Sequence, residues 1–138
     1  MAYGRVFQHG LHGIPPFTGE GPFVGTVVAL SLDGTTELWR WEKPLALLAG
    51  SLAVANGVVF FQSPIEEPVP LQPPLAWALY AVHALTGETL VRLPFSGRAV
   101  SGPVVAHGRV YVGKGNSAIN RIGEDFDGGL VCLGVAHE

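Results

Sequence analysis

Hydrophobic residues in this chain fall in short runs that are separated by polar turns containing glycine. Such runs predict β-strands joined by reversals, and the eleven prolines argue against long helices. Two pairs of runs flank a two-residue turn: 51–55 with 58–61, and 104–106 with 109–112. In the turns Asn56-Gly57 and His107-Gly108, the glycine supplies the positive φ that a tight hairpin needs.

A second kind of hairpin follows the first along the chain. The run 26–32 leads through Asp33-Gly34 into 37–41, and the run 78–83 leads through Thr86-Gly87 into 89–93. These turns place glycine and small polar residues where a reversal favours them. A final apolar run, 130–134, predicts one more strand near the end of the chain.

The pattern repeats with a period close to fifty residues. The motif Ala-x-Gly-x-Val-aromatic begins at Ala2, Ala55 and Ala106, which lie 53 and 51 positions apart. A second motif, Val28-Ala29-Leu30, recurs in step as Tyr80-Ala81-Val82 and Val131-Cys132-Leu133. A repeat of this length indicates a supersecondary unit stacked on copies of itself.

The complete unit is predicted to have four antiparallel strands, at 51–55, 58–62, 77–83 and 89–93. Such units, repeated at this period, are typical of β-propeller blades. We therefore expect an all-β fold, a partial propeller of about 2.5–3 blades. It forms a single domain over 1–138, with blade portions at roughly 1–42, 43–93 and 94–138. Closed rings have about four to eight blades, so we expect a section of a larger propeller; the alternative is self-association of several chains.

Long links are expected along one rim of these units. They are 9–24, 64–76 and 114–128, together with 43–50 and 94–101. Functional residues concentrate on loops that a rigid scaffold supports, so this rim is the predicted ligand face.

Composition narrows the classes of function. The net charge is −3 with no basic cluster, which gives no support for nucleic-acid binding. The stretch 44–65 has no charged residue, but Asn56-Gly57 within it favours a hairpin over a membrane span. The start of the chain lacks the features of a signal peptide. Cys132, the single cysteine, lies in an apolar run and is expected to be a small buried core residue.

The segment 81–91 reads Ala-Val-His-Ala-Leu-Thr-Gly-Glu-Thr-Leu-Val. It resembles the tryptophan-docking repeat of pyrroloquinoline-quinone (PQQ) propellers, Ala-x-Asp-x-x-Thr-Gly-x-x-x-Trp. Ala81, Thr86 and Gly87 fit this repeat, whereas His83 and Val91 depart from it. The earlier copy keeps an alanine, a glycine and a tryptophan but loses the Asp-to-Thr-Gly spacing.

The end of the chain is similar to the C-terminal part of quinoprotein alcohol dehydrogenase-like proteins, nearest the polyvinyl alcohol dehydrogenase group. The resemblance implies a periplasmic or secreted parent that oxidises alcohols with PQQ and calcium. Other members have lost the cofactor and serve as scaffolds, as in outer-membrane assembly lipoproteins. The expected function is thus a section of a PQQ-binding-like propeller, with this chain alone inactive. The alternative is a non-catalytic scaffold that binds protein or polysaccharide.

Candidate cofactor contacts lie in the last long link. Arg121 would pair with a quinone carboxylate, a geometry that its planar fork suits, and Asn116 and Asn120 would hydrogen-bond beside it. The alternative is that these three side chains make ordinary hydrogen bonds within the loop and contact no ligand.

Metal ligation has two weak candidates. Asp125 and Asp127, next to Glu124, offer carboxylates for calcium, but the ordered series of an EF-hand loop is absent. His9 and His12 share a spacing that would serve a metal only in a loop that folds back. A solvated loop is the competing interpretation in both cases. No P-loop, zinc-ribbon, dinucleotide or serine-hydrolase pattern is present.

The tryptophans have a structural explanation. Trp39 and Trp41 lie two residues apart on a predicted outer strand, where large aromatic side chains fill the gap between adjacent blades. Trp77 begins a strand and would flank the ligand face. His83 is expected to be structural, and His107 to be a turn residue.

Overall fold

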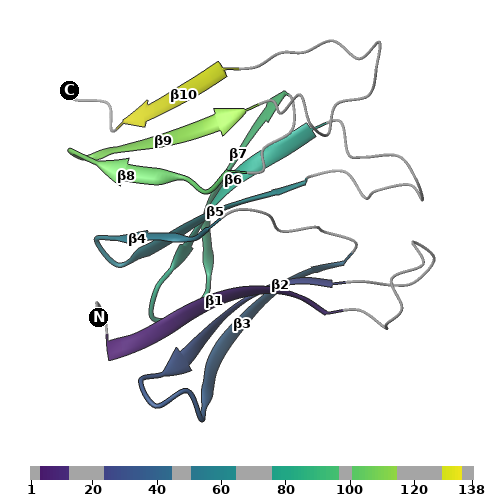
Figure 1. The fold of residues 1–138 in the computed structure, drawn as a ribbon, viewed down its shortest axis with the longest axis vertical. Helices are drawn as coiled ribbons and strands as arrows, with labels where there is room; N and C mark the ends of the chain where they lie inside the picture. Colours follow the sequence, from purple (N-terminus) through teal and green to yellow (C-terminus); the bar gives the residue numbers. More distant parts are fainter. Residues whose placement is uncertain are drawn as a thin grey trace.

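The computed structural model describes residues 4–12, 24–44, 51–64, 76–96, 101–114 and 129–134. The elements it contains in these segments are all β-strands, and they form three antiparallel sheets (Figure 1). The first sheet has the order β1 (Arg5–His12), β2 (Val24–Ser31), β3 (Glu37–Pro44). The second has the order β4 (Ala53–Ala55), β5 (Val58–Pro64), β6 (Ala76–His83), β7 (Thr89–Ser96). The third is formed by β8 (Val104–Ala106), β9 (Arg109–Lys114) and β10 (Gly129–Gly134).

The predicted all-β class and the repeated antiparallel unit are confirmed. The second sheet has the expected four strands in chain order. The first sheet corresponds to the last three strands of this unit, and the third sheet corresponds to its first three. The sheets are stacked one above another and do not close on themselves in the described segments (Figure 1).

The two-residue hairpin turns adopt the geometry that their sequence predicts. Asn56 and Gly57 have φ values of 49° and 76°, and His107 and Gly108 have values of 51° and 71°. Positive φ at both positions is typical of the type I′ turn, whose twist matches that of the flanking strands. His107 is therefore a turn residue, as expected.

The second hairpin type is also copied between sheets. Each copy has a register shift at one point, between Ala29 and Leu30 in the first sheet and between Ala81 and Val82 in the second. The turns close through matching backbone bonds, from Ser31 N–H to the Thr36 carbonyl at 2.9 Å and from His83 N–H to the Glu88 carbonyl at 2.8 Å. The two hairpins are therefore built on the same pattern of strand pairing.

Several strands run further than the sequence predicted. β1 continues to His12, so the backbone of His9 and His12 belongs to a strand and not to a loop. β7 continues through Pro94 to Ser96. The strand ends that flank the long links still share one edge, because His12 and Pro44 both pair with Val24.

The main hydrophobic core lies between the first and second sheets. Its buried residues alternate along the strands and come from both sheets: Val27, Ala29, Trp39, Val59, Phe61, Ala78, Tyr80, Val82 and Ala84. Cys132 was expected to be buried, but it is exposed. It lies on the outer face of the third sheet, whereas Ala81, the equivalent residue of the second sheet, is 6% exposed.

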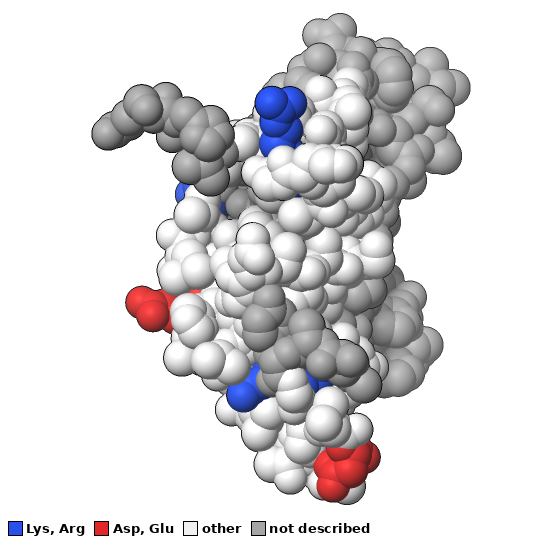
Figure 2. Space-filling view, turned by 90° about the vertical axis from the view of Figure 1, so that its left-hand side faces the viewer, with Lys and Arg blue, Asp and Glu red and all other residues white. Residues whose placement is uncertain are grey.

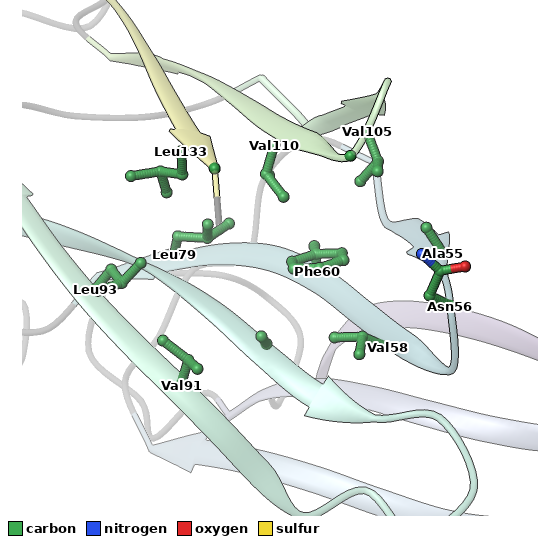
Figure 3. Close-up of a pocket in the computed structure, with 13 residues that line it drawn as sticks. Ala55, Asn56, Val58, Phe60, Leu79, Val91, Leu93, Val105, Val110 and Leu133 are labelled. Atoms are coloured by element: carbon green, nitrogen blue, oxygen red, sulfur yellow. The ribbon is translucent and has the colours of Figure 1, made fainter. Parts of the chain in front are cut away.

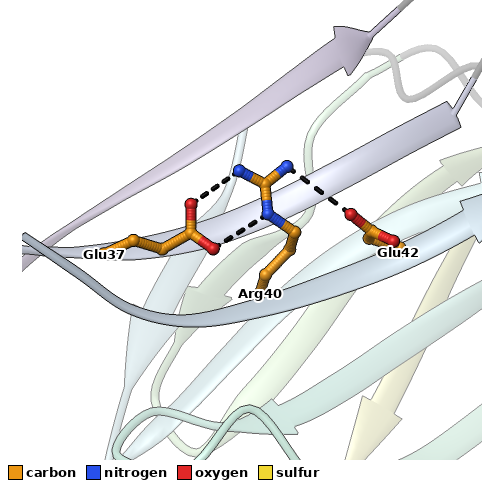
Figure 4. A network of polar contacts seen from close by, with 3 residues as sticks. All are labelled: Glu37, Arg40 and Glu42. Carbon is orange, nitrogen blue, oxygen red and sulfur yellow. Dashed lines mark hydrogen bonds and ion pairs between the residues drawn. The ribbon is translucent and has the colours of Figure 1, made fainter.

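The outer edge of the first sheet carries charge. Arg40 on β3 binds both carboxylate oxygens of Glu37, at 2.9 Å through Nε and at 2.6 Å through Nη2, and lies 3.6 Å from Glu42 (Figure 4). Exposed ion pairs of this kind contribute little to stability, because solvent screens the two charges. Charged side chains on an edge strand also discourage pairing with another strand.

Candidate functional site

Trp39 joins the first sheet to the second. Its side chain leaves β3, is 9% exposed, and donates from Nε1 to the Ala84 carbonyl at 2.9 Å. Its ring also lies over Gly87, where a Cβ atom would come within 2.7 Å of the indole. Phe7 contacts the same indole, with ring centroids 5.9 Å apart. One turn of the second sheet is thus the docking surface for a tryptophan of the first.

Trp41 extends this contact along the same strand. Its ring packs edge-on against Phe61 and Tyr80 of the second sheet, with centroids 4.7 and 5.1 Å away. Its Nε1 donates to the Thr89 hydroxyl at 3.3 Å. The predicted packing role of Trp39 and Trp41 between adjacent units is confirmed.

The second and third sheets meet differently. Val91 is paired with Ala81 in the second sheet, just as Trp39 is paired with Ala29 in the first, so Val91 occupies the position of Trp39. Two residues further along the strand, Leu93 occupies the position of Trp41 in the same way. The two tryptophans of the first interface are therefore replaced by smaller side chains in the second. A cavity of about 280 Å³ lies there, with walls from both sheets (Figure 3).

The second and third sheets approach most closely at their first strands. A Cβ atom on Gly102, just before β8, would lie 2.5 Å from the Ser51 carbonyl oxygen, just before β4. Backbone atoms cannot move aside as a flexible side chain can, so this approach requires glycine. Gly102 and Ser51 occupy the same position in consecutive repeats, which brings equivalent ends of two units together.

Two buried polar side chains lie at the other end of the second sheet, beside the long links. Gln62 on β5 is 1% exposed and Trp77 on β6 is 2% exposed. Neither the Gln62 amide nor Trp77 Nε1 has a hydrogen-bond partner. Buried polar atoms of this kind are rare in native proteins and call for a partner such as water or a ligand. The sequence placed Trp77 at this rim but did not single out Gln62.

The turns hold polar residues for structural reasons. His83 Nδ1 accepts from the Leu85 N–H at 3.1 Å, which supports its expected structural role. In the equivalent turn, Asp33 accepts from the Ser31 hydroxyl at 2.5 Å and from Thr35 N–H at 3.1 Å. The hydroxyl of Ser31, followed by the Thr35 backbone and side chain, lowers the pKa of Asp33 to about 2.

The candidate cofactor and calcium residues of the sequence fall outside the described residues. They are Asn116, Asn120, Arg121, Glu124, Asp125 and Asp127. The backbone of His9 and His12 is described and belongs to β1. The prediction that these two histidines lie in a loop is therefore wrong. Within the described segments, no three His, Cys, Asp or Glu side chains gather as metal ligands.

No protein-family model matches the chain, and no curated protein matches it significantly. None of the described segments forms a helix long and apolar enough to cross a membrane. Figure 2 shows one face on which charged residues occur only at isolated points within a broad uncharged surface. The features of the described segments that bear on function are therefore the interfaces between sheets and the buried polar pair, Gln62 and Trp77.

Proposed function

We propose that this chain is a section of a β-propeller of the quinoprotein repeat type. Its sheets would act as consecutive blades that support a ligand-binding rim of long loops. The observation that carries this proposal is the contact of Trp39 with the next unit. In the repeat that the sequence resembles, a tryptophan ends one motif and an Ala-to-Thr-Gly segment begins the next. Here Trp39 of one unit docks on Ala84 and Gly87 of the following one.

In a propeller, directional packing of this kind would continue beyond the three sheets. The second sheet turns one face to the first sheet and the other to the third. The outer face of the third sheet exposes Val104 and Leu130, which are 59% and 71% exposed. Leu79, the equivalent of Leu130 in the second sheet, is 3% exposed beneath the third sheet. The outer face of the third sheet is thus a docking surface for a further sheet of the same repeat.

In a solution of this chain alone, the first sheet of a second copy would cover that face. We expect the wild-type chain to associate in sedimentation velocity, and we expect the double variant Val104→Asp with Leu130→Asp to shift it to monomer. A charged carboxylate in a packed sheet interface is strongly unfavourable. Leu85→Asp is the matched control, because Leu85 is 53% exposed in a turn of the second sheet, which takes no part in this contact. A wild-type chain that stays monomeric at high concentration contradicts the blade arrangement.

Quinone-dependent alcohol oxidation by the larger protein is the second candidate function. Gln62 and Trp77 favour it, because their unpaired N–H groups at the rim would suit the carbonyl oxygens of a ligand. The described residues do not fit the whole group, however. Arg121, the candidate partner of the quinone carboxylates, lies outside the described residues.

Titration with PQQ and Ca²⁺, followed by tryptophan fluorescence, tests this candidate. If the protein depends on quinone, we expect saturable binding that Arg121→Gln weakens about tenfold. A tenfold loss corresponds to roughly 1.4 kcal/mol, which is the order of magnitude expected for one charge-assisted hydrogen-bonded pair. Arg92→Gln, an exposed cation on β7, is the matched control. Absence of PQQ binding removes the oxidative role and leaves a scaffold for protein or polysaccharide.

A further inference from the structure

The two interfaces between sheets use equivalent positions, but only the first is filled. Trp39 and Trp41 close the first interface with two indole rings. Val91 and Leu93 hold the same positions in the second interface and remain 44% and 40% exposed. The space beside them is thus the place that a bicyclic ring occupies one repeat earlier.

The walls of this space are apolar and uncharged. The second sheet contributes Val58, Phe60, Leu79, Ala81, Val91 and Leu93, and the third sheet contributes Val105, Val110 and Leu133. Among the described residues, no Asp, Glu, Lys, Arg or His lines the cavity. Since burial of an unpaired charge is costly, a charged ligand would be excluded. Phe60 offers a ring to an aromatic ligand, and the side chain of Asn56 lies at one end of the cavity (Figure 3).

The size of the space sets the size of the ligand. Apolar cavities of about 150 Å³ bind benzene in water. At about 280 Å³, this cavity has room for two fused rings. The glycines Gly108 and Gly134 also line it, and they carry no side chain that would obstruct an approach.

We propose that the space between the second and third sheets binds a small uncharged aromatic molecule of one or two rings. The ligand takes the place that the indoles of Trp39 and Trp41 hold in the preceding interface. A single polar atom on the ligand is tolerated at the Asn56 end, where an amide can donate or accept. The site is distinct from the rim and does not depend on PQQ.

Indole is the probe, and its binding to the full 138-residue chain is measured by isothermal titration calorimetry and by saturation-transfer NMR. We expect saturable binding of indole, and binding of indole-3-acetate weaker by about tenfold or more because its carboxylate would be desolvated. Leu93→Trp should abolish indole binding, since the new side chain fills the cavity from β7. Leu90→Trp is the matched control: it makes the same change on the same strand, at a residue that is 46% exposed and does not line the cavity.

Two outcomes overturn the proposal: no saturable binding up to the solubility of indole, or equal binding to the wild-type and Leu93→Trp chains. If Leu93→Trp does not fold, Leu133→Phe narrows the same space from β10, and unchanged binding there also overturns it. Association through Val104 and Leu130 uses the other face of the third sheet, so failure of one proposal is distinguishable from failure of the other.

Discussion

Replacement of Trp39 by phenylalanine is expected to lower the free energy of unfolding by about 1–3 kcal/mol. The aromatic ring is largely kept, but the buried Ala84 carbonyl loses the N–H that it accepts from at 2.9 Å. Trp39→Ala removes the ring as well and is expected to cost about 3–5 kcal/mol. Both values are measured by urea unfolding followed by circular dichroism, with the midpoint compared at unchanged slope.

Trp41→Phe provides the control on the same strand. Its Nε1 bond to Thr89 is 3.3 Å long and exposed, so its loss is expected to cost less than about 1 kcal/mol. Equal destabilisation by Trp39→Phe and Trp41→Phe would contradict a docking role for the Ala84 carbonyl. It would instead attribute the stability of the first interface to ring packing alone.

The sequence predicts the repeated unit well because its determinants are local. Asn56-Gly57 and His107-Gly108 specify turns with positive φ at both positions, whatever the sheets do. The period close to fifty residues then fixes which strand pairs with which. The register shift after Ala29 recurs after Ala81, which shows that even an irregularity is copied with the unit.

Strand lengths and exposure were predicted less well, because they depend on neighbouring units. Because proline cannot donate a ladder hydrogen bond, the predicted strand ended before Pro94. In the structure β7 continues through Pro94, because β7 is an edge strand of the second sheet, where proline is tolerated. Cys132 lies in an apolar run like that of a core strand. Whether such a run is buried depends on the sheet that covers it, and the described segments contain none beyond β10.

In the candidate site, too, some features follow from the local sequence and others depend on how neighbouring sheets pack. Alignment of the repeats places Val91 at the position of Trp39, and this departure from the motif is visible in the sequence. That the change leaves a cavity is a property of the distance between two sheets, which no local pattern encodes. The unpaired amide of Gln62 likewise follows from packing around it and carries no sequence signal.

Substitution of Gly87 by alanine is expected to destabilise the protein by about 2–5 kcal/mol. Two costs add: about 1–2 kcal/mol because its φ of 77° is left-handed, and about 1–3 kcal/mol because the new Cβ would lie 2.7 Å from the Trp39 ring. Gly34→Ala is the matched control. Gly34 has nearly the same φ, 75°, but nothing lies within 4 Å of its Cβ position, so only the backbone cost applies.

A double-mutant cycle then isolates the contact between the sheets. If the indole is the obstacle, Gly87→Ala should cost less in a Trp39→Leu background, because the smaller side chain makes room for the new methyl group. Gly34→Ala should cost the same in both backgrounds, since it contacts no ring. Urea unfolding of the four chains in each cycle measures the difference. Equal costs for Gly87→Ala with and without the indole would mean that the ring does not rest on this turn, and the link between the first and second repeats would then need another explanation.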